Sequence, residues 1–155
     1  MEYYATEFTV RATEFDASYV LGGTPKILDR MRALEEAEGM SASDKGMLTI
    51  LELALEMHAR GIAFLPVDMG KSRARQFVVE GGNIRLPFVS IPKLGEKAAD
   101  ALERERDAGP FLSIADVKRR GKLSSTVIDT MRAMGCFDGM PETEQLSFFD
   151  EAFGM

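Results

Sequence analysis

The residues best placed to do chemistry lie in a short turn at residues 91–95, with the sequence IPKLG. We expect the end of a short apolar helix before the turn and a second helix that opens near Glu96. Backbone N–H groups at the start of that helix would lack partners and would lie at the positive end of the helix dipole. This combination favours an anion and is typical of a helix-hairpin-helix.

Lys93 and Lys97 flank the turn and can add charged hydrogen bonds to the same anion. A DNA phosphate fits best, so we expect Lys93, Leu94, Gly95 and Lys97 to bind DNA without reading its sequence. Lys93 stands where such a turn usually has its first glycine, which costs free energy if φ there is positive. The alternative is a turn that joins two helices for packing alone.

Charge is unevenly distributed along the chain, whose net charge is −6. Residues 1–60 hold 6 basic and 11 acidic side chains (−5), residues 61–140 hold 13 and 10 (+3), and residues 141–155 hold 0 and 4 (−4). Because local patches decide whether a phosphate backbone is attracted, the middle region is the candidate DNA surface. Besides the turn, its cations are Lys71, Arg73 and Arg75, then Lys118, Arg119, Arg120 and Lys122 in a predicted loop between two helices. Each cluster alone could equally be a solvated face.

Composition excludes several classes of protein. The chain has 155 residues, 45% hydrophobic and 28% charged, as expected for one domain or two small subdomains. No apolar run approaches the ~20 residues of a membrane span, and the N-terminus lacks a signal-peptide pattern, so we expect a cytoplasmic protein with no membrane partner. A single cysteine, Cys136, and a single histidine, His58, leave no metal site, no catalytic role and no cofactor in this chain.

The patterns predict a mainly α fold with a small β-hairpin or sheet, in the α+β class. We expect helices from Thr24, as N-cap, to Gly39 and from Ser41 to Gly61, then an edge strand within residues 62–68. A hairpin follows at residues 76–86 around a glycine-rich turn. Further helices are expected to begin at Ser113 and Ser124.

Four segments are predicted: a helical segment at 1–61, a small β-sheet connector at 62–88, a helix-hairpin-helix region at 89–137 and a flexible tail at 138–155. The tail contains an apolar peptide at residues 145–149 that docks either on the chain's own core or in a pocket of another protein.

Taken in order, these segments resemble the C-terminal region of the PolC-type DNA polymerase III alpha subunit, a C-family bacterial polymerase. The resemblance covers nearly the whole chain. It is carried by residues 4–11 (YATEFTVR), 48–68 (LTILELALEMHARGIAFLPVD), 87–99 (PFVSIPKLGEKAA), 109–116 (GPFLSIAD) and 135–149 (GCFDGMPETEQLSFF).

The resemblance implies that residues 1–61 are the end of the fingers and that residues 91–95 hold newly made duplex DNA. It also implies that the tail binds the sliding clamp through Gln145, Leu146, Phe148 and Phe149, with Phe148 where the family commonly has Leu. The implied partners are duplex DNA, the clamp and the rest of the polymerase chain.

The catalytic part of such a polymerase is expected to lie upstream. Family members transfer nucleotides with palm carboxylates that hold two divalent metal ions, and this chain contains no Asp-x-Asp pair. We therefore expect a chain that is part of a nucleotidyltransferase but inactive alone. The alternatives are a stand-alone module that docks on a clamp-like partner without DNA, and a free-standing helix-hairpin-helix repair protein.

Overall fold

The computed structural model describes residues 1–143 and confirms the mainly helical α+β class. Its helices are α1 (Glu2–Val10), α2 (Gly23–Glu36), α3 (Ala42–Ala59), α4 (Glu96–Ala108), α5 (Ile114–Gly121) and α6 (Ser125–Ala133). Its strands are β1 (Phe64–Leu65), β2 (Val78–Glu80) and β3 (Asn83–Arg85), and 3-10 turns occupy η1 (Ala12–Glu14), η2 (Ala17–Tyr19) and η3 (Phe88–Ser90). None of the helices described is both long and apolar enough to cross a bilayer.

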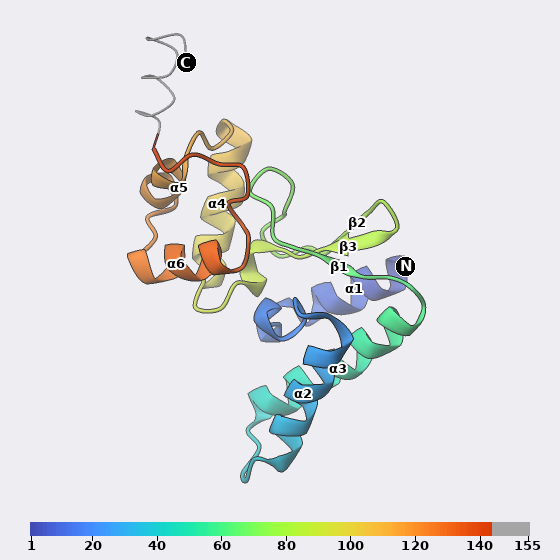
Figure 1. The fold of residues 1–155 in the computed structure, drawn as a ribbon. Coiled ribbons are helices and arrows are strands. Elements are labelled where there is room, and N and C mark those ends of the chain that lie inside the picture. The colour runs from blue at the N-terminus through green and yellow to red at the C-terminus, as the bar shows by residue number, and fades with distance from the viewer. Residues whose placement is uncertain (144–155) are drawn as a thin grey trace.

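Helices α2 and α3 pack side by side at one end of the molecule, and α4, α5 and α6 gather at the other end (Figure 1). The sheet and α1 lie between these two groups. The candidate DNA-binding turn therefore lies in a helical group that is separate from the acidic α2–α3 pair.

A local capping signal explains where α3 begins, but not where α2 begins. Helix α3 starts with the expected capping box, in which the Ser41 side chain accepts from Asp44 N–H and the Asp44 carboxylate accepts from Ser41 N–H. The prediction that Thr24 caps α2 is wrong, because α2 starts at Gly23 and the Thr24 hydroxyl instead lies 3.1 Å from His58 Nδ1. This contact links the start of α2 to the end of α3.

The sheet has the order β1-β3-β2, with β1 parallel and β2 antiparallel to β3. Glu80 pairs with Asn83, so the hairpin has a two-residue turn, and both its residues have positive φ, 58° at Gly81 and 83° at Gly82. Such a turn matches the twist of the strands and favours glycine. The predicted hairpin and the edge position of the first strand are confirmed.

One arginine holds the sheet together from the side. The Arg85 guanidinium hydrogen-bonds both carboxylate oxygens of Glu80, at 2.6 and 2.8 Å, and also donates to the Pro66 carbonyl at 2.9 Å. These hydrogen bonds from Arg85 lower the pKa of Glu80 to about 2. Glu80 therefore stays charged at neutral pH and fixes β2 against β3.

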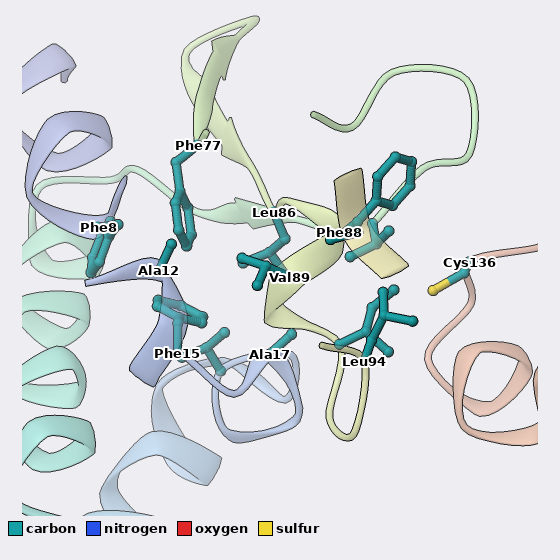
Figure 2. Close-up of a cluster of buried hydrophobic side chains, with 14 of the residues drawn as sticks. Phe8, Ala12, Phe15, Ala17, Phe77, Leu86, Phe88, Val89, Leu94 and Cys136 are labelled. Atoms are coloured by element: carbon teal, nitrogen blue, oxygen red, sulfur yellow. The ribbon is translucent and has the colours of Figure 1, made fainter. Parts of the chain in front are cut away.

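A continuous set of buried side chains runs from α1 to the helix-hairpin-helix (Figure 2). At one end the Phe77 ring lies 5.5 Å from Phe8 and 4.8 Å from Phe15, and these contacts join α1 and η1 to the sheet. At the other end the buried side chains include Leu94 and Cys136. The predicted segments at 1–61, 62–88 and 89–137 thus share one core.

The tail that we expect to be flexible from residue 138 makes defined contacts with α5 and α6 at residues 141–142. The Pro141 and Glu142 carbonyls accept from the N–H groups of Ile114 and Ala115, at 2.9 and 3.0 Å, and Glu142 pairs with Arg132. These contacts cap the start of α5, a tertiary pairing that composition does not reveal. The predicted peptide at residues 145–149 lies outside the described residues.

The aromatic contact between α1 and the sheet gives a stability prediction. We expect Phe77→Ala to lower the free energy of unfolding by about 3–5 kcal/mol, because Phe77 is 2% exposed and its removal leaves a cavity. Urea denaturation followed by circular dichroism measures this. Val10→Ala, at a residue 78% exposed, is the control and should change the value by less than about 0.5 kcal/mol. Equal effects of the two changes would contradict the packing described.

Candidate nucleic-acid interface

The turn before α4 has the geometry that the sequence predicts. Leu94 N–H donates to the Ile91 carbonyl at 3.1 Å, and Leu94 is buried. Gly95 is the N-cap of α4, with φ −75° and ψ 168°. The element before the turn is the 3-10 turn η3, whereas we expected the end of a helix. The turn is thus fixed by a buried leucine while α4 starts at the surface.

The start of α4 offers free hydrogen-bond donors. Gly95 makes no side-chain cap, and the N–H groups of Gly95, Glu96 and Lys97 have no acceptor within residues 1–143. The side chains of Lys93 and Lys97 are exposed, and neither makes an ion pair with another described residue. The anion-binding features expected of this turn are therefore present together.

Lys93 has φ of 69°, in the left-handed region that favours glycine. The lysine at this position therefore has the free-energy cost that a positive φ brings to a non-glycine residue. A left-handed residue is needed here because the chain reverses direction between Pro92 and the buried Leu94.

A second turn, between α5 and α6, repeats this geometry. Lys122 has φ of 53°, Leu123 is buried, and Ser124 is an N-cap with φ −73° and ψ 160°. Lys93 and Lys122 are the only non-glycine residues with positive φ in residues 1–143. The N–H groups of Ser125 and Thr126 have no acceptor in that range, as at the start of α4.

Sequence reasoning placed Lys122 in a basic cluster but missed Leu123 and Ser124 as parts of a site. The signal was available, since Lys-Leu followed by a small residue and a helix occurs at both Lys93-Leu94-Gly95 and Lys122-Leu123-Ser124. The two turns are therefore a local repeat, with serine in place of glycine in the second.

Gly121 allows the helices of the two turns to pack closely. A Cβ atom at Gly121 would lie 2.8 Å from Leu102 Cδ2 and 3.1 Å from Leu123 Cγ. Any side chain here would have to displace the side chains of Leu102 and Leu123. The close approach of α4 to the end of α5 therefore favours a glycine.

The prediction of a cationic loop at residues 118–122 is wrong, because α5 extends to Gly121. Lys118, Arg119 and Arg120 lie in the last turn of that helix, where cations also complement the helix dipole. Lys118 Nζ donates to Ser125 Oγ at 2.7 Å, and Arg119 pairs with Asp116 at 2.5 Å.

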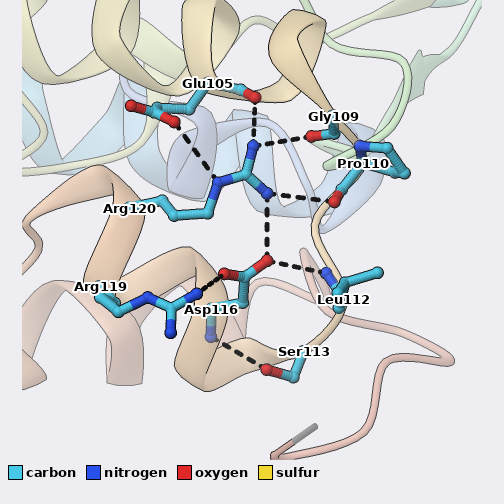
Figure 3. Close-up of polar contacts among 8 residues, drawn as sticks. All are labelled: Glu105, Gly109, Pro110, Leu112, Ser113, Asp116, Arg119 and Arg120. Carbon is cyan, nitrogen blue, oxygen red and sulfur yellow. Dashed lines mark hydrogen bonds and ion pairs between the residues drawn. The ribbon is translucent and has the colours of Figure 1, made fainter.

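Arg120 lies at the centre of a network of hydrogen bonds and ion pairs between α4 and α5 (Figure 3). Its side chain is 19% exposed, donates to the carbonyls of Glu105, Gly109 and Pro110, and pairs with the carboxylates of Glu105 and Asp116. Its guanidinium thereby ties the end of α4 to α5. We therefore leave Arg120 out of the proposed DNA surface, although the sequence placed it there.

Asp116 completes this network from the start of α5. Burial acts to raise the pKa of Asp116, but a hydrogen bond from Leu112 N–H and the Arg120 guanidinium together hold the pKa below its ordinary value. Ser113 also caps α5 by accepting from Asp116 N–H at 3.0 Å. The helix that precedes the second turn is thus fixed at its start.

Every member of the third basic cluster is paired to a carboxylate, on β2 for Lys71 and on α4 for the two arginines. Lys71 pairs with Glu80 at 3.3 Å, and Arg73 pairs with Glu103 at 3.5 Å. Arg75 pairs with acidic residues in the first turns of α4. A direct contact between these three cations and DNA stays a prediction.

The described residues give no support to metal binding or to catalysis by a thiol. No group of three potential metal ligands occurs within residues 1–143. Cys136 is buried, and burial raises the pKa of its thiol to about 12, so the thiol is not a nucleophile at neutral pH.

Residues 61–146 match the model of the helix-hairpin-helix motif family, and the chain belongs to that family. Over 95–96% of its length it is also similar to proteins named DNA polymerase III PolC-type, which confirms the resemblance. Identity is 38% over 149 residues in Thermotoga maritima, 42% over 149 in Bacillus subtilis and 43% over 148 in Clostridium perfringens. The aligned region covers only 10–11% of these relatives, so the chain corresponds to about a tenth of their length.

The left-handed backbone at Lys93 gives a second prediction. We expect Lys93→Gly to be about 1 kcal/mol more stable than Lys93→Ala, because both remove the charge and only glycine relieves the strain. Thermal and urea unfolding of the two variants test this. Equal stability, or a more stable alanine variant, would contradict a strained turn.

Proposed function

We propose that this chain holds duplex DNA, without sequence preference, as the duplex-binding part of a PolC-type DNA polymerase III. The observation that carries the proposal is the pair of turns in which an exposed, left-handed lysine precedes a buried leucine and a helix start with free N–H groups. Membership of the helix-hairpin-helix family and similarity to PolC-type polymerases support it.

Each turn would bind a phosphate of the DNA backbone. The free N–H groups would donate to phosphate oxygens, and Lys93 and Lys97 at one turn and Lys122 at the other would add charge. Because the contacts reach phosphates and not base edges, binding would be independent of sequence. Non-specific contacts of this kind typically give a Kd of ~10⁻⁴–10⁻⁶ M at physiological salt.

Nucleotide transfer is proposed to belong to the rest of such a polymerase. In our account the palm domain there holds the divalent metal ions, and this chain keeps the product duplex close to that domain. The chain alone is therefore expected to bind DNA without extending a primer. As part of a bacterial replicative polymerase it would work in the cytoplasm.

The DNA-binding proposal is tested by fluorescence anisotropy with a labelled 20-mer duplex at several salt concentrations. We expect Lys93→Ala with Lys122→Ala to weaken binding uniformly across sequences and to reduce the slope of log K against log salt by about 2, or about 1 for each phosphate that is no longer neutralised. Lys26→Ala with Lys45→Ala removes two exposed lysines from α2 and α3 and is the matched control. Unchanged affinity in the Lys93→Ala, Lys122→Ala variant would refute the placement of the DNA surface. No binding by the native chain would favour a module that docks on a protein partner only.

We also propose that the tail tethers the chain to the sliding clamp through Gln145, Leu146, Phe148 and Phe149. These residues lie outside the described part of the chain, and the proposal depends on the resemblance and on their sequence. The Pro141 and Glu142 contacts to α5 would fix the point from which the peptide leaves. Two weak attachments to the same DNA–clamp assembly would raise each other's effective concentration.

The tethering proposal predicts that Leu146→Ala with Phe149→Ala abolishes binding to immobilised clamp without changing the melting temperature. Glu151→Gln, beyond the peptide, is the control and should bind the clamp like the native chain. Retained clamp binding would contradict the assignment of the peptide. A marked fall in melting temperature would show that the two side chains belong to the chain's own core.

A further inference from the structure

Helix α4, whose start forms the first turn's candidate phosphate site, is itself rich in acidic residues. It carries five carboxylates and three cations, so its own charge would repel DNA. The carboxylates are Glu96, Asp100, Glu103, Glu105 and Asp107, and the cations are Lys97, Arg104 and Arg106.

Every one of these carboxylates has a cationic partner in the structure. Glu96 and Asp100 both pair with Arg75, Glu103 pairs with Arg73, Glu105 with Arg120 and Asp107 with Arg106. Lys93 and Lys97 have no such partner among the described residues. The pairing therefore leaves free cations beside the turn and no free carboxylate on the helix.

The two carboxylates nearest the turn depend on one residue. Arg75 Nε lies 3.1 Å from Asp100 Oδ1, Arg75 Nη2 lies 2.6 Å from Asp100 Oδ2, and Arg75 Nη1 lies 3.7 Å from Glu96 Oε1. The planar guanidinium thus engages Asp100 through two nitrogens and Glu96 through the third. Glu96 is the first residue of α4, so without a partner its charge would stand beside the N–H groups offered to a phosphate.

We infer that Arg75 is a positioning residue that masks Glu96 and Asp100, which means that it neutralises their charge. It thereby reduces the repulsion between these carboxylates and a DNA phosphate at the start of α4. This role differs from the direct phosphate contact that the basic cluster at residues 71–75 predicts. The guanidinium already hydrogen-bonds Asp100 through two nitrogens, and this contact lowers the pKa of Asp100 and raises that of Arg75. The inference rests on the proposed DNA binding and names the residue that permits it.

Masking and direct contact differ in how they respond to removal of the carboxylates. If Arg75 masks, its loss matters only while Glu96 and Asp100 carry charge. If Arg75 touches a phosphate, its loss weakens binding whether or not those carboxylates are present. Replacing both carboxylates with uncharged amides therefore separates the two roles.

The experiment measures binding to a labelled 20-mer duplex by anisotropy for the native chain, Arg75→Gln, and Arg75→Gln combined with Glu96→Gln and Asp100→Asn. We expect Arg75→Gln to weaken binding by about three- to tenfold, as a partly screened charge near the site would. The triple variant should return to within about twofold of the native chain, with the native salt slope. Arg60→Gln, which breaks an exposed ion pair with Glu56 on α3, is the matched control and should leave binding unchanged.

Two results would overturn the masking role. A triple variant as weak as Arg75→Gln would show a direct contact, and native binding by Arg75→Gln would show that no mask is needed. Because Arg75 is about half exposed, its ion pair with Asp100 contributes little to stability. Melting temperatures of the variants, with Arg75→Ala as a second variant, identify any folding defect. Absence of binding by the native chain would instead refute the proposed function, and the inference with it.

Discussion

The left-handed backbone at Lys93 and Lys122 is the constraint on which both turns depend. In each turn this residue reverses the chain so that the next residue, a leucine, enters the core and the following helix starts at the surface. The helix start then keeps N–H groups without acceptors among residues 1–143, which is favourable only where water or an anion can reach them. A glycine would adopt this backbone at less cost, but a lysine adds a positive charge next to the free donors.

Packing beneath the turns makes this arrangement rigid. Gly121 lets α5 approach Leu102 of α4, and Arg120 joins the ends of both helices through carbonyl and carboxylate contacts. Arg120 thus supports the proposed DNA surface from behind it, and we propose that Arg75 neutralises carboxylates at its edge. In a chain with a net charge of −6, the pairing of charges rather than their number decides where a phosphate can bind.

Features that depend on neighbouring residues in the sequence were predicted well. The capping box at Ser41, the Gly81-Gly82 hairpin and the turn before α4 each have a local signal that the structure confirms. The second turn also had a local signal, but counting Lys122 among four cations hid it. Features that depend on tertiary contacts were missed, because no local pattern shows that Arg120 bonds the end of α4 or that residues 141–142 cap α5.

The central claim is that both turns present backbone N–H groups to DNA phosphates. The most direct measurement is a titration of the ¹⁵N-labelled chain with a 20-mer duplex, monitored by the amide signals in NMR spectra. Our account predicts the largest shift changes at Glu96, Lys97, Ser125 and Thr126, with little change along α2 and α3. It also predicts that these changes diminish as salt is raised. Shift changes confined to α2 and α3, or absent from both turns at low salt, would contradict the account.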